Sequence, residues 1–228
     1  MVMFVDDIRN TIDLKVHVRP MTGRQARYHA ARSAATQAKL LAAMEDLLDA
    51  GESFTDITVQ RLIEEAGVSR ATFYAHFRTK SDVLVCLADR LREQQLARAQ
   101  AWDPTLGEED GAERYAQYWL EIITAQRASH SIMAAVRVAA SYDPGVGDFY
   151  SDDLETFDEL IRSLLLSEKA AGSAPADLDA ANASKIIIWG VGGAMARHIG
   201  TDDGSGDAAF ARELGRIFWY GAYRRPAD

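Results

Sequence analysis

Two short blocks of hydrophobic residues at helical spacing, separated by a tight turn, lie between residues 55 and 80. The first block is an apolar stripe formed by Val59, Leu62, Ile63 and Ala66. Thr58 precedes this stripe as a favourable helix N-cap, and Ser69 takes the same place before the second block. Gly67 lies between the blocks and offers the backbone freedom that a sharp turn needs. In the second block Phe73 and Phe77 stand four residues apart, so both face the same core. The pattern predicts two short helices joined by a tight turn.

The chain beyond residue 32 shows helical periodicity throughout, and no segment alternates as a β-strand would. We expect helices at about 33–50, 79–100, 112–126, 131–141, 148–170, 177–198 and 207–223 in addition to the two short ones. Polar or glycine-rich linkers separate several of them. These elements predict an all-α chain that is divided into an arm (1–32), a head (33–80) and a larger helical body (81–228).

The second short helix presents mostly polar side chains opposite its two phenylalanines. A helix this short is unstable alone, so its importance lies in what it presents. A helix that is held across a second helix and exposes donors and a cation fits the way a helix-turn-helix enters the major groove. The candidate DNA-binding residues are Thr58, Gln60, Ser69, Arg70, Ala71, Thr72, Tyr74, His76 and Lys80. Tyr74 and Lys80 are expected to contact phosphate, whereas Arg70 and Thr72 are expected to contact base edges.

The segment AGVSRATFYAHFRTK (66–80) resembles the centre of the amino-terminal domain of the TetR family of one-component transcriptional regulators. The resemblance runs from about residue 36 to residue 87 and departs from the family pattern at Ile63, Glu65 and Ala71. None of these departures removes a DNA-facing group. The resemblance implies a homodimer that binds a palindromic operator through its heads and an inducer through its carboxy-terminal domains. The body bears a looser resemblance to EthR-type members of this family, whose pocket is a long tunnel lined by aromatic residues.

The net charge of −9 is divided unevenly between residues 15–80, which are the head with the second half of the arm, and the body. Residues 15–80 carry ten Lys or Arg and seven Asp or Glu, a net of +3, whereas residues 81–228 carry 14 and 24, a net of −10. Phosphate binding depends on local cation density, so a basic head on an acidic body is compatible with binding DNA. We expect the acidic body to repel the duplex and so to orient the head toward it.

The amino-terminal segment and the single cysteine bear on partners and compartment. The arm is basic in its second half through Arg19, Arg24, Arg27 and Arg32. It is either an extension that touches DNA or a leader without a role in binding. Its first residues lack the pattern of a secretory signal, and no apolar run is long enough to span a bilayer. Cys86 lies on a helical apolar stripe and is expected to pack in a core. We expect a cytoplasmic protein with no membrane partner.

Aromatic side chains are concentrated in the body, which carries all four tryptophans. Amphipathic aromatics around a helical core are a common lining of apolar ligand pockets, although each of them could equally serve for packing alone. The candidate pocket residues are Trp102, Tyr115, Trp119, Met133, Phe149, Phe157 and Trp189. Because this set is short of fixed charges, the expected effector is a hydrophobic small molecule.

The last two predicted helices carry more apolar surface than one pair of helices buries, and Gly190, Gly192 and Gly193 permit close helix approach. Helix-turn-helix heads bind palindromes as symmetric dimers, so an interface is required. The family resemblance implies that it lies on these two helices. The candidate dimer residues are Ile187, Trp189, Met195, Phe210, Leu214, Ile217 and Phe218.

Three other patterns point to different chemistry and are weaker. The segment GVGGAM lacks the third glycine of a dinucleotide-binding loop, because Met195 stands there. Asp202, Asp203 and Asp207 lack the spacing of a calcium loop, so we expect a solvated loop. The five histidines show neither metal-ligand spacing nor a nucleophile partner. The sequence therefore predicts no catalytic residue, no metal and no cofactor.

Taken together, these patterns predict an all-α protein with an amino-terminal three-helix helix-turn-helix DNA-binding domain and a larger helical domain for ligand binding and dimerisation. Its expected function is that of a repressor, which a hydrophobic small molecule releases from a palindromic operator. Two other classes remain open. A structural DNA-binding protein that senses nothing would show little sequence specificity and no ligand effect. A helical enzyme that retains the head would turn over a bound small molecule.

Overall fold

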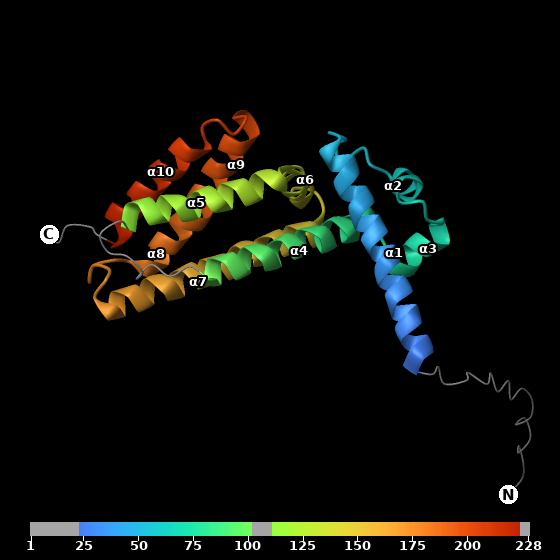
Figure 1. Cartoon of the computed structure of the whole chain (residues 1–228), viewed down its shortest axis with the longest axis horizontal. Coiled ribbons are helices and arrows are strands. Elements are labelled where there is room, and N and C mark those ends of the chain that lie inside the picture. The colour runs from blue at the N-terminus through green and yellow to red at the C-terminus, as the bar shows by residue number, and fades with distance from the viewer. Residues whose placement is uncertain (1–22, 102–110, 224–228) are drawn as a thin grey trace, which may run out of the picture.

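A computed structural model of the chain describes residues 23–101 and 111–223, and it places the side chains of residues 31–101 and 111–222. Figure 1 shows an elongated molecule in which α1, α2 and α3 lie at one end, while the long helix α4 runs from this end along the rest. No β-strand occurs within the described ranges, so the predicted all-α fold class is confirmed. None of the helices in these ranges is both long and apolar enough to cross a membrane.

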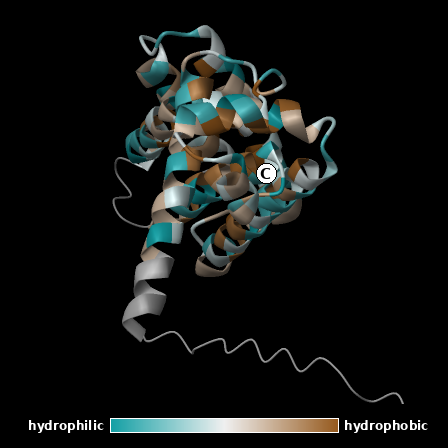
Figure 2. Ribbon diagram, turned by 90° about the vertical axis from the view of Figure 1, so that its right-hand side faces the viewer, coloured by the Kyte–Doolittle hydropathy of each residue, from teal (hydrophilic) through white to brown (hydrophobic). Residues whose placement is uncertain are grey.

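The helices in chain order are α1 (Gly23–Asp49), α2 (Val59–Ala66), α3 (Arg70–His76), α4 (Lys80–Ala101), α5 (Gly111–Ala128), α6 (His130–Ala140), α7 (Pro144–Ala171), α8 (Ala180–Lys185), α9 (Gly192–Thr201) and α10 (Asp207–Phe218). Two π-helical segments are continuous with them, namely η2 (Ile186–Val191) between α8 and α9 and η3 (Trp219–Tyr223) after α10. Figure 2 shows hydrophilic and hydrophobic segments alternating along the individual helices, as amphipathic helices require.

The two short helices of the head begin and end as the sequence predicts. Thr58 caps α2, because its hydroxyl accepts the backbone N–H of Arg61 with a donor–acceptor distance of 3.0 Å. Ser69 caps α3 in the same way and accepts the N–H of Thr72 at 3.1 Å. Gly67 ends α2 in the left-handed region with φ 61°, a conformation that favours glycine. The predicted helix–turn–helix is therefore confirmed.

The core of the head continues into the body. Phe73 is fully buried and Phe77 nearly so, as their spacing predicts. The same hydrophobic cluster contains Ile132 and Val136 of α6 and Val146 of α7. Because these residues share one core with α1–α3, a displacement of α6 would be felt in the head.

Helix α1 is longer than the sequence suggested. It begins at Gly23 and not near residue 33, so residues 23–32 of the expected arm are helical. The remainder of that arm, residues 1–22, lies outside the described residues.

Side-chain caps fix the starts of α4 and α7. Thr79 and Asp82 form a reciprocal capping box, in which each side chain accepts the backbone N–H of the other residue at 3.2 and 3.0 Å. Helix α7 begins at Pro144, four residues earlier than expected, because Asp143 caps it by accepting the N–H of Gly145. Proline is well suited to this first helical turn.

The body is held together by a close contact between α5 and α10. A Cβ atom added to Gly215 would lie only 2.6 Å from the backbone nitrogen of Ala116 and 2.7 Å from the carbonyl oxygen of Ala112. Glycine is therefore required where α10 crosses α5. The single helix expected at 177–198 is instead α8, η2 and α9 in succession, with a π-helical turn in its middle.

Candidate DNA-binding surface and ligand cavity

The outer side of α3 carries a group of exposed side chains around Arg70 and Tyr74. Nη2 of Arg70 lies 3.4 Å from the Tyr74 hydroxyl, and its guanidinium carbon lies 5.6 Å from the centroid of the Tyr74 ring. Tyr74 remains 48% exposed, and Ala71 is exposed on the same helix. The buried Phe73 fixes the rotation of α3 about its axis, so this group faces outward.

The other candidate DNA-binding residues flank this group. The hydroxyls of Ser69 and Thr72 lie 2.7 Å apart and share a hydrogen bond. Thr58 and Gln60 are exposed at the start of α2, and His76 is half-buried at the end of α3. Contact of these side chains with DNA stays a prediction.

Lys80 lies in a different environment from the one the sequence suggested. Its Nζ donates to the carbonyl oxygens of Phe54, Thr55 and Ile57 at 2.5, 3.1 and 2.7 Å. Burial lowers the pKa of Lys80 from its ordinary value. An ammonium group has three N–H donors, and all three point into the head. The expected phosphate contact of Lys80 is therefore corrected to a structural role, because this side chain ties the loop before α2 to the start of α4.

A cavity of about 260 Å³ lies in the body, between α4, α5, α6, α7, η2 and α9. Its aromatic lining residues are Tyr118, Trp119, Tyr150, Phe157 and Trp189. The π-helix η2 contributes Ile187, Ile188 and Trp189 to this wall. Single π-turns inside α-helices are frequent at functional sites, so the presence of η2 in this wall favours the cavity as a candidate ligand site.

The cavity includes four of the seven predicted pocket residues, namely Trp119, Met133, Phe157 and Trp189. Tyr115 does not line it, because it is buried between α5 and α10 with its ring centroid 6.2 Å from that of Phe218. Phe149 does not line it either, because it packs against the core shared with the head, 5.3 Å from the guanidinium carbon of Arg92. These two assignments are corrected, and Trp102 lies outside the described residues.

The cavity also has polar lining residues that are absent from the predicted set: Gln95, Gln126, Arg137 and Asp153. Asp153 is the most buried of them, with 9% of its surface exposed. Burial raises the pKa of Asp153 to about 6, against the opposing attraction of Arg92. Within the described part of the chain, neither Oδ1 of Asp153 nor the indole nitrogen of Trp119 has a hydrogen-bond partner. The expectation of a pocket short of fixed charges is therefore wrong.

A signal for Asp153 is present in the sequence. The side of α7 that faces the cavity carries Tyr150, Leu154, Phe157 and Ile161 at helical spacing. Asp153 falls on this apolar stripe and interrupts it. A lone acidic residue on an inward stripe must be paired, neutralised or used by a ligand.

The predicted dimer residues are mostly buried inside the protomer. Those in its core are Ile187, Met195, Leu214 and Phe218. Phe210 stacks on the His198 ring with a centroid distance of 4.3 Å. These five are corrected, because each helix turns the predicted apolar face toward its own body. Trp189 and Ile217 are 47% and 61% exposed and stay candidates.

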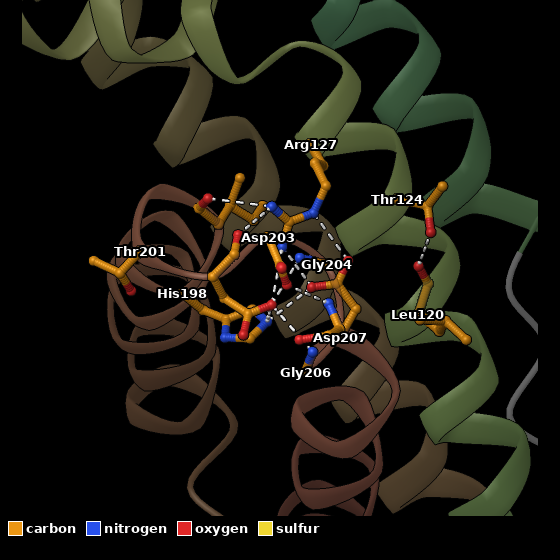
Figure 3. Close-up of polar contacts among 12 residues, drawn as sticks. Leu120, Thr124, Arg127, His198, Thr201, Asp203, Gly204, Gly206 and Asp207 are labelled. Carbon is orange, nitrogen blue, oxygen red and sulfur yellow. Dashed lines mark hydrogen bonds and ion pairs between the residues drawn. The ribbon is translucent and has the colours of Figure 1, made fainter.

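An ionic cluster ties the loop between α9 and α10 to α5 (Figure 3). Arg127 donates to both carboxylate oxygens of Asp207 at 3.0 and 2.6 Å and to the carbonyl oxygen of Asp202 at 2.7 Å. Nε2 of His198 lies 2.8 Å from Asp207. The atoms of His198, Asp202 and Asp207 lie close enough to hold a metal ion, but the Arg127 guanidinium already forms an ion pair with Asp207. The sequence predicts a solvated loop here. This prediction is wrong for Asp207, which is buried, whereas Asp203 is exposed as expected.

These features define a helix-turn-helix protein in which a capped, outward-facing recognition helix is joined to a helical body with a cavity. Residues 44–85 match the family model described as bacterial regulatory proteins of the tetR family. The head of this chain is therefore a helix-turn-helix domain of the TetR type.

Similar proteins agree with this assignment. The HTH-type transcriptional regulator EthR of Mycolicibacterium smegmatis is 30% identical over 142 residues, which cover 61% of this chain and 63% of that protein. EthR of Mycobacterium tuberculosis is 28% identical over 145 residues, 62% of this chain and 65% of that protein. The matched region thus spans less than two thirds of these curated relatives.

Solved structures extend the likeness to the whole fold. Salmonella enterica GusR superposes with a TM-score of 0.64 at 15% identity, covering 83% of this chain and 96% of that one. A TetR-family transcriptional regulator of Pectobacterium atrosepticum gives a TM-score of 0.61 at 19% identity, covering 86% and 98%. At these identities the two structures support the fold alone.

Proposed function

We propose that this protein is a homodimeric transcriptional repressor, which binds a palindromic operator through α3 and releases it when a small molecule occupies the cavity. The observation that carries the proposal is the outward-facing Arg70–Tyr74 group on a short helix whose rotation is fixed by a buried phenylalanine. An arginine in the major groove can donate two hydrogen bonds to one guanine, which gives sequence discrimination. The exposed Arg78, just after α3, supplies accompanying attraction to phosphate.

Dimerisation is supported by apolar surface that the protomer leaves uncovered on its last helical segments. The exposed fractions are 67% for Ile186, 47% for Trp189, 61% for Ile217 and 60% for Tyr220. A second copy of this chain would cover such residues and bring two α3 helices to successive major grooves, roughly 34–36 Å apart. One head alone covers half a site, so the dimer carries most of the affinity.

Signal transmission is supported by two hydrogen bonds that join the two ends of α6 to α1 of the head and to the start of α4, which follows the head. At one end of α6, Ser131 donates to the carboxylate of Asp49, which ends α1. Beyond its other end, Asp143 accepts a hydrogen bond of 2.5 Å from Ser81, in the first turn of α4. Met133 of α6 lies in the cavity wall between these two links. Helix α6 could adopt more than one position, and a ligand that binds the cavity more tightly in one of them would favour that position. Through these two links, the shift of α6 would move the head as well.

The DNA-binding half of the proposal can be tested with the purified full chain and a library of random duplexes. Selection should enrich a palindrome with half-sites about 10 base pairs apart. Arg70→Ala should weaken binding to that sequence by roughly 5- to 150-fold, as expected for one lost base contact. Arg162→Ala, which removes an exposed arginine of α7, is the matched control and should bind normally. Failure to enrich any sequence would favour a structural DNA-binding protein, and equal losses in both variants would remove α3 from the interface.

A further inference from the structure

We infer that the cavity selects a small organic ammonium ion, which is held by the carboxylate of Asp153 within aromatic walls. This inference rests on the proposed function, because it names the chemical class of the effector. It concerns this chain's own side chains and can be tested without DNA.

The first support is a carboxylate without a partner. Asp153 is 9% exposed, lines the cavity, and has an Oδ1 atom that accepts no hydrogen bond from the described residues. The cation that acts on it electrostatically is Arg92. Nη2 of that guanidinium forms an ion pair with Asp89 and its carbon lies over the Phe149 ring, while its Nε has no hydrogen-bond partner among the described residues, so Arg92 does not bond to Oδ1 of Asp153. A buried carboxylate left in this state is costly, and a cationic ligand would remove that cost.

The second support is the composition of the walls. The five rings around the cavity belong to Tyr118, Trp119, Tyr150, Phe157 and Trp189. Aromatic faces attract cations, and this attraction is greatest where water is excluded. A cage of rings with one carboxylate therefore favours an ammonium group that carries an apolar substituent. A volume of about 260 Å³ lies just below the range of roughly 300–1,000 Å³ of drug-sized sites, so the ligand should be small.

An anionic ligand is the competing possibility, because Arg137 also lines the cavity. Arg137 is only half-buried, so water already solvates its charge. Asp153 is more deeply buried and gains more from a partner of opposite charge. The cavity thus discriminates in favour of cations.

Calorimetry on the full chain can decide between these ligands with three probes of similar shape: phenethylamine, phenethyl alcohol and phenylacetate. At about pH 8 the amine should bind at least ~10-fold more tightly than the alcohol, as one charge-assisted hydrogen bond allows. Asp153→Asn should abolish this preference. Asp152→Asn removes a neighbouring exposed carboxylate and should keep it.

A pH titration gives a second measurement that needs no variant. Because the pKa of Asp153 is about 6, the affinity for the amine should fall by up to ~10-fold for each pH unit below that value. The alcohol does not need the negative charge and should lack this fall. The charged groups around Asp153 are Arg92 and Asp89 on α4 and Arg137 on α6, while the described cavity wall has no charged side chain from α5 or η2.

Three outcomes would overturn the inference: equal binding of amine and alcohol, tighter binding of phenylacetate, or no binding of any probe at millimolar concentration. An unchanged amine preference in Asp153→Asn would do the same. These outcomes are separate from those of the proposed function. Amine binding that leaves operator affinity unchanged would contradict the proposed function, while release of the operator by uncharged ligands alone would contradict only the amine site.

Discussion

Replacing Asp153 by asparagine is expected to stabilise the ligand-free protein at neutral pH, although it removes a charged group. Asparagine has nearly the same shape as aspartate and stays neutral at every pH. Burial raises the pKa of Asp153 to about 6, which is about two pH units above the ordinary value for aspartate. The folded chain therefore holds a proton that the unfolded chain has already released between about pH 4 and pH 6.

The size of this effect follows from the linkage between proton binding and folding. Each pH unit through which only the folded state keeps the proton lowers the free energy of unfolding by ~1.4 kcal/mol. The loss is complete above the folded pKa and absent below the unfolded one. The variant should therefore exceed the wild type by up to ~3 kcal/mol at about pH 7.5 and by ~1.5 kcal/mol at about pH 5.

Urea denaturation at these two pH values, followed by circular dichroism, measures the difference directly. Other carboxylates titrate in both proteins and cancel in the comparison. Asp152→Asn controls for the loss of one negative charge from α7, because Asp152 is exposed. A gap that is the same at both pH values, or a variant less stable than the wild type at neutral pH, would refute the assignment of Asp153 as a buried and uncompensated carboxylate.

Three further predictions concern the head, its link to α6 and the dimer. Lys80→Ala should lower the thermal stability of the head by ~2–3 kcal/mol, because three carbonyl oxygens lose a charged donor; melting against Lys39→Ala, which removes an exposed lysine of α1, checks this. Ser131→Ala should speed hydrogen exchange at the end of α1 about fivefold, as one lost hydrogen bond implies, and unchanged exchange by mass spectrometry would argue against the link. Ile217→Asp should yield monomers in sedimentation velocity while Arg212→Asp, an exposed control on α10, stays dimeric; a dimeric Ile217→Asp would move the interface elsewhere.

The head could be predicted closely because its determinants are local. Thr58, Ser69 and Gly67 specify the helix ends through contacts within four residues, and the spacing of Phe73 and Phe77 fixes the buried side of α3. No distant part of the chain is needed to read these signals.

Lys80 is the exception within the head. Its partners are carbonyl oxygens of residues 54–57, more than twenty positions earlier in the chain. Nothing in the local sequence shows that this loop turns its carbonyls toward the start of α4. The local sequence therefore predicts a phosphate contact for a lysine beside a recognition helix, and its distant partners are visible only in the structure.

The cavity and the dimer surface depend on long-range packing, which periodicity does not specify. Tyr115 and Trp119 both face inward from α5, yet only Trp119 reaches the cavity, because α10 covers Tyr115. Similarly, α10 has two apolar sides, and the protomer core uses the one with Leu214 and Phe218. The sequence does not show which of the two sides packs into the core. The structure is therefore needed to identify the side with Ile217 as the exposed one.

If the state of the cavity controls the affinity for DNA, one pair of variants can reveal this coupling without a known effector. Ala99 lines the cavity from α4, whereas Ala97 is exposed on the same helix. Phenylalanine at either position adds the same bulk, inside the cavity at residue 99 and on the surface at residue 97. Fluorescence anisotropy with the selected operator measures the DNA affinity of each variant. We predict that Ala99→Phe weakens operator binding by roughly 5- to 150-fold, the usual size of an allosteric coupling, while Ala97→Phe binds as the wild type does. Equal affinities of the two variants, with both folded and dimeric, would contradict a coupling between the cavity and DNA binding.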